Sequence, residues 1–236
     1  MHNLALALQA KGYVISGSDD AIFEPSKSRL QKAGLFPVEL GWDESQISSE
    51  LDGVILGMHA KKEQITTQQM RSFAVSMEAA GVPMIQVAHG AGLGGNSLQH
   101  GFALHSNEAY WDAVAPVLNN TVMSVLLIPG LGTMNELRVA HEHGVRSVHV
   151  ATHSTEADTS PQHIACGREL GMDTSGFLMM AHLNTSQGLA EEAKKMESYG
   201  AQTVYVTDSA GYMLPEDVTE YVSALRDTLD DATEIG

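Results

Sequence analysis

The sequence predicts an α/β fold of the (β/α)8, TIM-barrel-like class, and two features of the chain predict it. First, from residue 53 onward short apolar runs alternate with longer segments of helical pattern. Second, the runs end at positions 24 to 40 residues apart: His59, His89, Pro129, His153, His182 and Asp208. That spacing is the length of a strand plus a crossover helix, so the strands should be parallel. Continuous apolar runs also predict strands that are covered on both faces.

The elements follow in order along the chain. Before the repeat, the pattern predicts a helix, a strand and a second helix at 2–12, 13–20 and 25–34. Further strands are predicted at 53–59, 83–90, 124–130, 147–154, 175–182, 203–211 and 232–236. The intervening helices are predicted at 66–81, 107–120, 133–144, 160–171 and 186–200, and most of them end in Gly, the usual stop signal. The eight strands suffice to close a barrel, and no linker interrupts a single domain over residues 1–236.

Composition excludes several classes of function. The formal net charge is −16, which disfavours binding to the phosphate backbone of nucleic acid. The chain contains no apolar run of about 18 residues and no signal-peptide pattern, so we expect no membrane span and a cytoplasmic location. Cys166 is the only cysteine, which excludes an internal disulfide and a multi-cysteine metal site. The sequence does not define an oligomeric state.

Polar residues mark the predicted strand ends. His89, His153 and His182 should lie at one edge of the barrel, where the sites of this fold class are found. Taken one at a time, each is better interpreted as a hydrogen-bonded structural histidine. The glycines of "HGAGLGG" and "PGLGT" are interpreted as residues that permit tight turns, because glycine clusters alone are weak indicators of phosphate binding.

Two parts of the chain resemble different families. Residues 57 to 236 resemble the barrel domain of 4-hydroxy-2-oxovalerate aldolase, in segments such as "AGVPMIQVAHGAGLGGNSLQHGFALH", "QHIACGRELGMDTSGFLMMAH" and "AQTVYVTDSAGYMLPEDV". Residues 2 to about 60 resemble the N-terminal domain of Mur ligases of the murein-peptide ligase type, in "MHNLALALQAKGYVISGSDD" and "DGVILGMHAK". Together the resemblances imply a chimera, natural or engineered, with a circularly permuted strand order.

The aldolase resemblance implies roles for particular residues. In that family an Arg-Asp-Gly triplet ends the first strand, the Asp binds a divalent metal, usually manganese, and the Arg steadies the pyruvate enolate. Here the triplet is replaced by Ile55, Leu56 and Gly57, while the histidine that follows is retained as His59. The family also continues beyond the position of Gly236 into a His-x-His pair. His59 is therefore expected to be a relict base, and no metal ligand is expected.

The resemblance also implies a substrate-binding set. Ser209 matches a serine near the pyruvate carboxylate, and Leu126 and Ile128 lie on the strand that shapes the aldehyde pocket. The small-molecule ligand, if one binds, would be a 2-oxo acid.

Three interpretations of function follow. The first is a chimeric scaffold with a relict aldolase cavity, little or no activity and no cofactor. The second is a lyase of the class II pyruvate aldolase type, which uses manganese to cleave a 4-hydroxy-2-oxo acid into pyruvate and an aldehyde. In that case His59 is the base, and metal ligands come from Asp19, Asp20 or Asp208. The third, a nucleotide-sugar-binding module, is disfavoured because the Gly-rich turn of Mur domains is missing.

Overall fold

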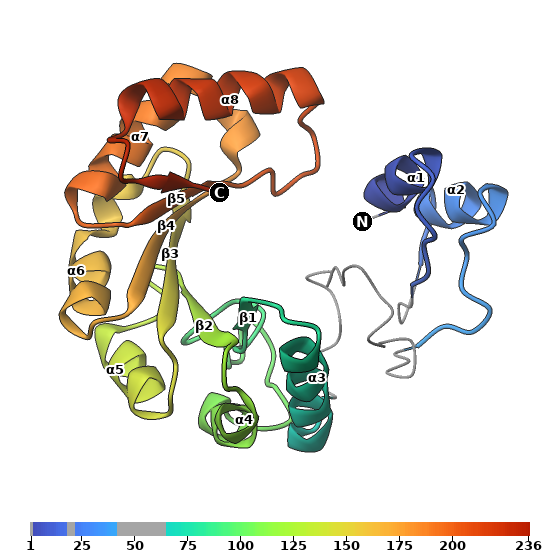
Figure 1. Cartoon of the computed structure of the whole chain (residues 1–236), viewed down its shortest axis with the longest axis horizontal. Helices are drawn as coiled ribbons and strands as arrows, with labels where there is room; N and C mark the ends of the chain where they lie inside the picture. Colours follow the sequence, from blue (N-terminus) through green and yellow to red (C-terminus); the bar gives the residue numbers. More distant parts are fainter. Residues whose placement is uncertain (1, 18–21, 42–64) are drawn as a thin grey trace. The chain divides into compact units, whose positions relative to one another are not determined.

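The computed structural model describes residues 2–17, 22–41 and 65–236 (Figure 1). The chain divides into two compact units, Met1–Ile65 and Thr66–Gly236, and each is considered by itself. The single domain over residues 1–236 therefore stays a prediction. In the described parts of the chain, no helix has the length and apolar character that crossing a bilayer requires.

In the first unit, two helices are described, α1 (His2–Ala10) and α2 (Ser26–Lys32). Both were predicted from the sequence. The strand predicted at 13–20 is wrong over residues 13–17, which form no strand. Tyr13 is 56 % exposed and Val14 fully exposed, and the described residues of the first unit contain no strand with which this apolar run could pair. Its expected neighbour at 53–59 lies outside the described residues.

The second unit is an α/β structure built on a parallel sheet, as the sequence predicts. The described residues form six strands in the order of the sequence: β1 (Met84–Gln86), β2 (Val122–Leu127), β3 (Ser147–His153), β4 (Asp173–Met179), β5 (Thr203–Val206) and β6 (Glu234–Ile235). Every neighbouring pair is parallel. The strand predicted at 232–236 is present as β6 and pairs with β5. The fold class is α/β, with a TIM-barrel-like arrangement of strands and helices.

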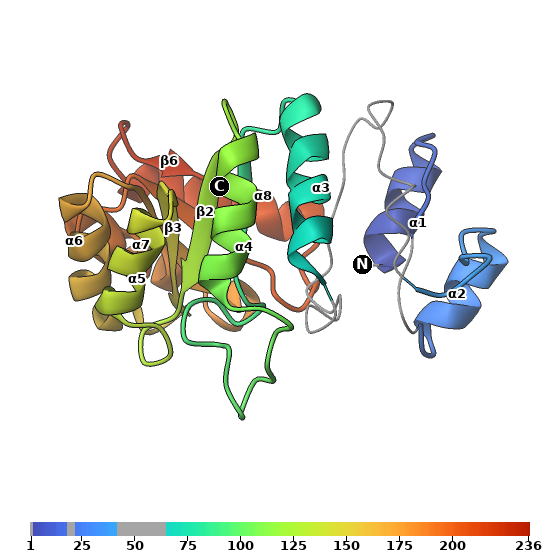
Figure 2. The same ribbon diagram turned by 90° about the horizontal axis from the view of Figure 1, so that it is seen from below.

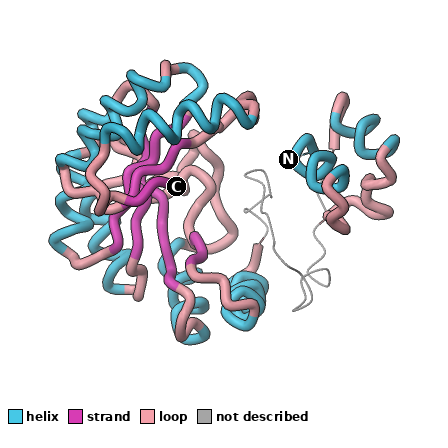
Figure 3. Tube along the Cα trace, turned by 45° about the horizontal axis from the view of Figure 1, so that its top comes forward, coloured by secondary structure: helices cyan, strands magenta, loops and turns pink. Residues whose placement is uncertain are grey.

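Helices alternate with these strands and lie along the outer side of the curved sheet (Figures 1 and 3). They are α3 (Thr67–Ala79), α4 (Asn107–Val114), α5 (Met134–Glu142), α6 (Pro161–Glu169), α7 (Ser186–Ser198) and α8 (Pro215–Thr228), with short 3-10 turns η3 (Ala115–Val117), η4 (Ala157–Thr159) and η5 (Ala181–Leu183). Four of the predicted stop glycines follow helices with positive φ: Gly81, Gly144, Gly171 and Gly200. The residue after a helix often takes this left-handed conformation, which glycine adopts without strain.

The two faces of the sheet differ in character. A Cβ added to Gly167 of α6 would meet Thr174 and Val148, so these two strand residues face the helices. Alternate positions along the strands on that side, such as Val125 and Val150, are completely buried. The opposite face carries polar and aromatic side chains that are often only half-buried. The apolar core therefore lies between sheet and helices, and the second face is not fully covered within the described residues.

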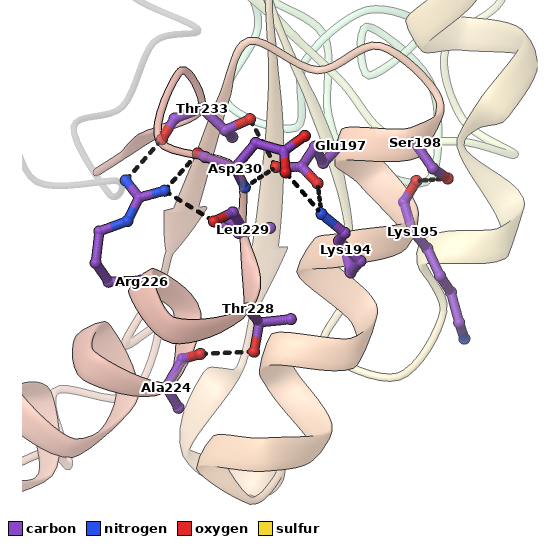
Figure 4. Close-up of polar contacts among 10 residues, drawn as sticks. All are labelled: Lys194, Lys195, Glu197, Ser198, Ala224, Arg226, Thr228, Leu229, Asp230 and Thr233. Atoms are coloured by element: carbon purple, nitrogen blue, oxygen red, sulfur yellow. Dashed lines mark hydrogen bonds and ion pairs between the residues drawn. The ribbon is translucent and has the colours of Figure 1, made fainter.

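Polar contacts hold the last strand in place (Figure 4). The Arg226 guanidinium of α8 donates to the carbonyl oxygens of Thr233, at 3.0 Å, and of Asp230. The Glu197 carboxylate of α7 accepts from the Asp230 backbone N–H and the Thr233 hydroxyl, each at 2.7 Å. These bonds fix the turn before β6 to two helices, which explains how a strand of two residues is positioned on β5.

A carboxylate also ties α3 to the start of β2. The backbone N–H groups of Thr121 and Asn120 donate to Glu78 at 2.9 and 3.0 Å. The helices α3 and α4 on this side of the sheet lie side by side (Figure 2). The bond from Thr121 is the main reason that the pKa of Glu78 falls to about 2, from an ordinary value of 4.5.

We expect the Glu78 bonds to make stability depend on pH. Because the pKa of Glu78 is lower in the folded chain, its stabilising effect is fully present above pH 4.5 and is lost as the pH falls towards about 2. Urea unfolding of the wild type and of Glu78→Gln should therefore differ at neutral pH, and the difference should shrink over that window. High salt should leave the difference in place, because backbone donors rather than distant charges cause it. A difference that is constant between neutral pH and pH 2 would contradict this role.

Candidate functional site

The candidate site lies at the carboxyl edge of the sheet. Because all six described strands are parallel, their carboxyl ends share one edge, and the loops that follow them meet there. The strand ends and the loops after them carry the residues that the sequence singled out: His89, Ile128, His153, His182, Asp208 and Ser209. His59 and Leu56 lie outside the described residues, as do Asp19 and Asp20.

Leu126 and Ile128 form an apolar part of this edge. Leu126 lies on β2 and pairs in register with His149 of β3, on the face away from the helices. Ile128 follows two residues later, and both side chains are half-buried. Two half-buried aliphatic side chains at a strand end suit contact with a small apolar group. The predicted role of these residues in a substrate pocket stays a prediction.

A glycine-rich loop packs directly against this strand end. The Leu93 N–H donates to the Leu126 carbonyl oxygen at 2.8 Å. Gly92 and Gly94 have φ of +81° and +75°, and a Cβ on either would lie 2.5 or 2.2 Å from a backbone oxygen. Glycine is needed because the backbone conformation and the close contact both exclude a side chain. The interpretation of "HGAGLGG" as a tight turn is confirmed.

The helix α4 holds the neighbouring end of β1. The Trp111 indole N–H donates to the Val87 carbonyl oxygen at 2.7 Å, and the His89 N–H donates to the Asn107 side chain at 3.2 Å. Trp111 is 1 % exposed. The segment that carries His89 is therefore positioned by a buried aromatic anchor.

Ser209 lies where the loops after β4 and β5 meet. The Met180 backbone N–H donates to Ser209 Oγ at 3.0 Å, and the Ala181 N–H donates to the Thr207 carbonyl oxygen at 3.0 Å. Met180 has a φ of 56°, a left-handed conformation that is uncommon for a residue with a side chain and is often found at functional sites. Ser209 is exposed, and its hydroxyl hydrogen has no acceptor among the described residues. The hydroxyl can therefore donate to an anion.

The three strand-end histidines do not share one contact. His89 Nδ1 accepts from the Ala91 N–H at 3.1 Å, and His153 Nδ1 lies 3.1 Å from the Thr155 hydroxyl. Both rings are hydrogen-bonded, as expected, and a structural role for them stays a prediction. His182 differs, because its Nδ1 faces the Asp208 carboxylate at 3.6 Å. The sequence marked both residues as strand ends, 26 positions apart, but each was considered alone.

No role was predicted for His149, which lies on β3, on the face of the sheet that points away from the helices. Its Nδ1 is 3.1 Å from the Gln86 side-chain amide, and its ring packs against Phe177 and Tyr205. Burial is the main cause that lowers the pKa of His149, opposed by the Asp173 carboxylate. The period-two alternation of β3 was the signal that could have placed it on this face.

The described residues do not fit a metal site. No group of three His, Cys, Asp or Glu side chains is arranged to hold an ion in the parts of the chain that the structure describes. Asp208 supplies a carboxylate, but its neighbour is a single imidazole. An octahedral site for a hard divalent ion needs more ligands than this pair provides.

A hollow at the opposite edge of the sheet is a poorer candidate. It has a volume of about 540 Å³ and is lined by the first residues of three strands, Asp173, Thr203 and Glu234, with their neighbours. Its lining contains two carboxylates and no basic residue, which disfavours an anionic ligand. The carboxyl edge remains the better candidate for an anionic ligand.

The described residues of the second unit define a TIM-barrel-like α/β protein with polar residues at the carboxyl edge of its sheet. The HMGL-like family model matches residues 56–236, and the chain belongs to that family.

Within that family, the chain is similar to several curated aldolases. It is 69 % identical over 180 residues to 4-hydroxy-2-oxovalerate aldolase 5 of Dechloromonas aromatica, which covers 76 % of this chain and 51 % of the relative. The figures for 4-hydroxy-2-oxovalerate aldolase 3 of Azotobacter vinelandii are the same. A relative from Comamonas testosteroni, 4-hydroxy-2-oxovalerate aldolase 2, is 54 % identical over the same length. The chain spans about half the length of these relatives.

A comparison of structures supports the fold. The carboxyl transferase domain of Rhizobium etli pyruvate carboxylase, in its Y628A form with pyruvate, aligns with a TM-score of 0.60 and 16 % identity. The alignment covers 71 % of this chain and 31 % of that domain's chain. At this identity the likeness concerns the fold alone.

These matches correct one interpretation from the sequence. The prediction of an inactive chimeric scaffold is wrong, because 69 % identity to curated aldolases over 180 residues favours an enzyme. The prediction depended on the altered triplet at 55–57, and it neglected the residues at the carboxyl ends of the other strands. The family match begins at residue 56, so the resemblance of residues 2–60 to Mur ligases stays a prediction.

Proposed function

We propose that residues 56–236 provide the substrate-binding edge of an aldolase that cleaves a 4-hydroxy-2-oxo acid into pyruvate and an aldehyde. The observation that carries this proposal is the 69 % identity over 180 residues to 4-hydroxy-2-oxovalerate aldolases. The geometry of the carboxyl edge supports it, because that edge combines a hydroxyl donor with an apolar strand end.

Each described residue has a limited role in this reaction. Loss of the 4-hydroxyl proton and cleavage of the bond between C3 and C4 release the aldehyde and leave the enolate of pyruvate, and donors placed beforehand stabilise such a charge. Ser209 donates its hydroxyl hydrogen to the substrate carboxylate, while the Met180 N–H holds the Ser209 oxygen in place. Leu126 and Ile128 contact the side chain of the departing aldehyde. His59 remains the proposed base.

The test is release of pyruvate from 4-hydroxy-2-oxopentanoate, coupled to lactate dehydrogenase. We expect the full chain to release pyruvate when manganese is supplied, and a parallel assay in EDTA shows whether release needs a divalent ion. Ser209→Ala should raise KM about tenfold or more, because a hydrogen bond to a charged group contributes about 1.5–3 kcal/mol. Ser198→Ala, at the end of α7, is the control and should leave KM unchanged. Absence of pyruvate release with manganese present would contradict the proposed function.

A further inference from the structure

His182 and Asp208 face one another across two neighbouring loops at the carboxyl edge. His182 lies in η5, after β4, and Asp208 lies two residues after β5. His182 Nδ1 and Asp208 Oδ1 are 3.6 Å apart, and the side chains are only 11 % and 23 % exposed. Both atoms are buried, and neither has a hydrogen-bond partner in the part of the chain that is described. Buried polar atoms are normally paired, so these two atoms are each other's natural partners.

The two oxygens of Asp208 have different surroundings. Oδ2 accepts from the Met213 N–H at 2.8 Å, and the Asp208 carbonyl oxygen accepts from the Gly211 N–H at 3.1 Å. These bonds close the loop that carries Ser209 and leave Oδ1 directed at His182. A carboxylate can only accept hydrogen bonds, so the proton between the two groups must belong to Nδ1 of the imidazole.

The remaining nitrogen of His182 is placed differently. Nδ1 is buried without a hydrogen-bond partner in the described part of the chain, and Nε2 does not share that condition. The His182 ring also packs at 5.6 Å from the Tyr212 ring, which limits its rotation. Backbone bonds from Met180 and Ala181, just before His182, lead to Ser209 and Thr207 in the other loop. The imidazole and the Ser209 hydroxyl are thus held by one set of contacts.

We propose that Asp208 is a positioning residue that keeps a proton on Nδ1 of His182, so that Nε2 is the nitrogen presented to a bound 2-oxo acid beside Ser209. The identity of the ligand rests on the proposed function, whereas the position of the proton does not. A carboxylate that orients an imidazole through one nitrogen fixes the tautomer and leaves the other nitrogen for the ligand.

The first test reads the tautomer directly. In the ¹⁵N-labelled full chain, long-range ¹⁵N–¹H spectra should show a protonated Nδ1 for His182, whose signals His182→Gln identifies by their loss. In Asp208→Asn the amide can still accept from the Met213 N–H while its NH₂ group faces the ring. The proton should then move to Nε2. Asp217→Asn is the control, since Asp217 also accepts a backbone N–H, from Leu214 at 2.8 Å, whereas the carboxylate that faces His182 is that of Asp208.

The second test adds pyruvate to the same samples. We expect the His182 Nε2 signal to shift in the wild type and in Asp217→Asn, and KM for the 4-hydroxy-2-oxo acid to rise at least about tenfold only in Asp208→Asn. A His182 tautomer that is the same in Asp208→Asn as in the wild type would overturn the proposal. If the Nε2 signal does not shift in a chain that still releases pyruvate, Nε2 does not contact the 2-oxo acid. That result would contradict this part of the proposal and leave the proposed function standing. If the chain neither binds nor releases pyruvate, both the assignment of a 2-oxo acid as the ligand of His182 and the proposed function would be contradicted.

Discussion

Replacement of Gly94 by alanine is expected to destabilise the second unit by more than about 2 kcal/mol. The left-handed conformation of Gly94, with φ +75°, costs about 1–2 kcal/mol for a residue with a side chain. In addition, the new Cβ would lie 2.2 Å from the Leu131 carbonyl oxygen, so the backbone of one loop must move. Urea unfolding followed by circular dichroism measures the loss.

Gly81→Ala is the matched control for Gly94→Ala. Gly81 has almost the same φ, +71°, but a Cβ there meets nothing within 4 Å. The control therefore reports the cost of the backbone conformation, and the difference between the two variants reports the clash. If both variants lose the same unfolding free energy, the loop 88–96 moves to relieve the clash at no cost. That loop would then not define the edge near Leu126.

Replacement of Trp111 by alanine is expected to cost about 3–5 kcal/mol of unfolding free energy, the usual range for a large buried aromatic side chain. Trp111 is 1 % exposed and donates to the Val87 carbonyl oxygen, so the change leaves a cavity and an unpaired acceptor. Trp111→Phe keeps most of the ring and loses the donor, and should cost less. Phe102→Ala, at a residue that is 55 % exposed, is the control and should change stability by at most about 0.5 kcal/mol.

The Trp111 variants also test whether packing in the core positions a residue of the candidate site. Since Trp111 and Asn107 of α4 both bind the segment that follows β1, loss of the indole should displace His89 as well. The imidazole signals of His89 in ¹⁵N–¹H spectra should change in Trp111→Phe while those of His153 stay constant. If Trp111→Ala unfolds with wild-type stability, the core between α4 and β1 is not organised as described.

The helices and strands of the second unit were largely predictable because their signals are local. Apolar runs and glycine stops lie within the segments that they define, and the structure has β2, β3, α6 and α7 where those signals indicate. The run at 13–17 has the same apolar character but no described partner strand, and an isolated strand cannot satisfy its backbone groups. A pattern of residue types specifies a strand only where a neighbouring strand is available.

The candidate site was less predictable because it depends on register. Ser209, Leu126 and Ile128 came from resemblance, and their positions at the carboxyl edge follow from the parallel sheet. The facing of His182 and Asp208 depends on how β4 pairs with β5 and on the left-handed conformation of Met180. Neither is visible in the spacing of single residues, so His182 was interpreted as a structural histidine and Asp208 as an alternative metal ligand, without a link between them.

The sequential strand order has a consequence for how the second unit is assembled. Each described strand pairs only with the strands before and after it in the sequence, so every step of pairing closes a loop of one crossover. The entropy of loop closure grows slowly with length, and no pairing among these strands has to wait for a distant segment. A chain that emerges from the ribosome can therefore add one strand and one helix at a time to a growing sheet. The two-residue strand β6 comes last in that order, after both helices that hold its preceding turn have been made.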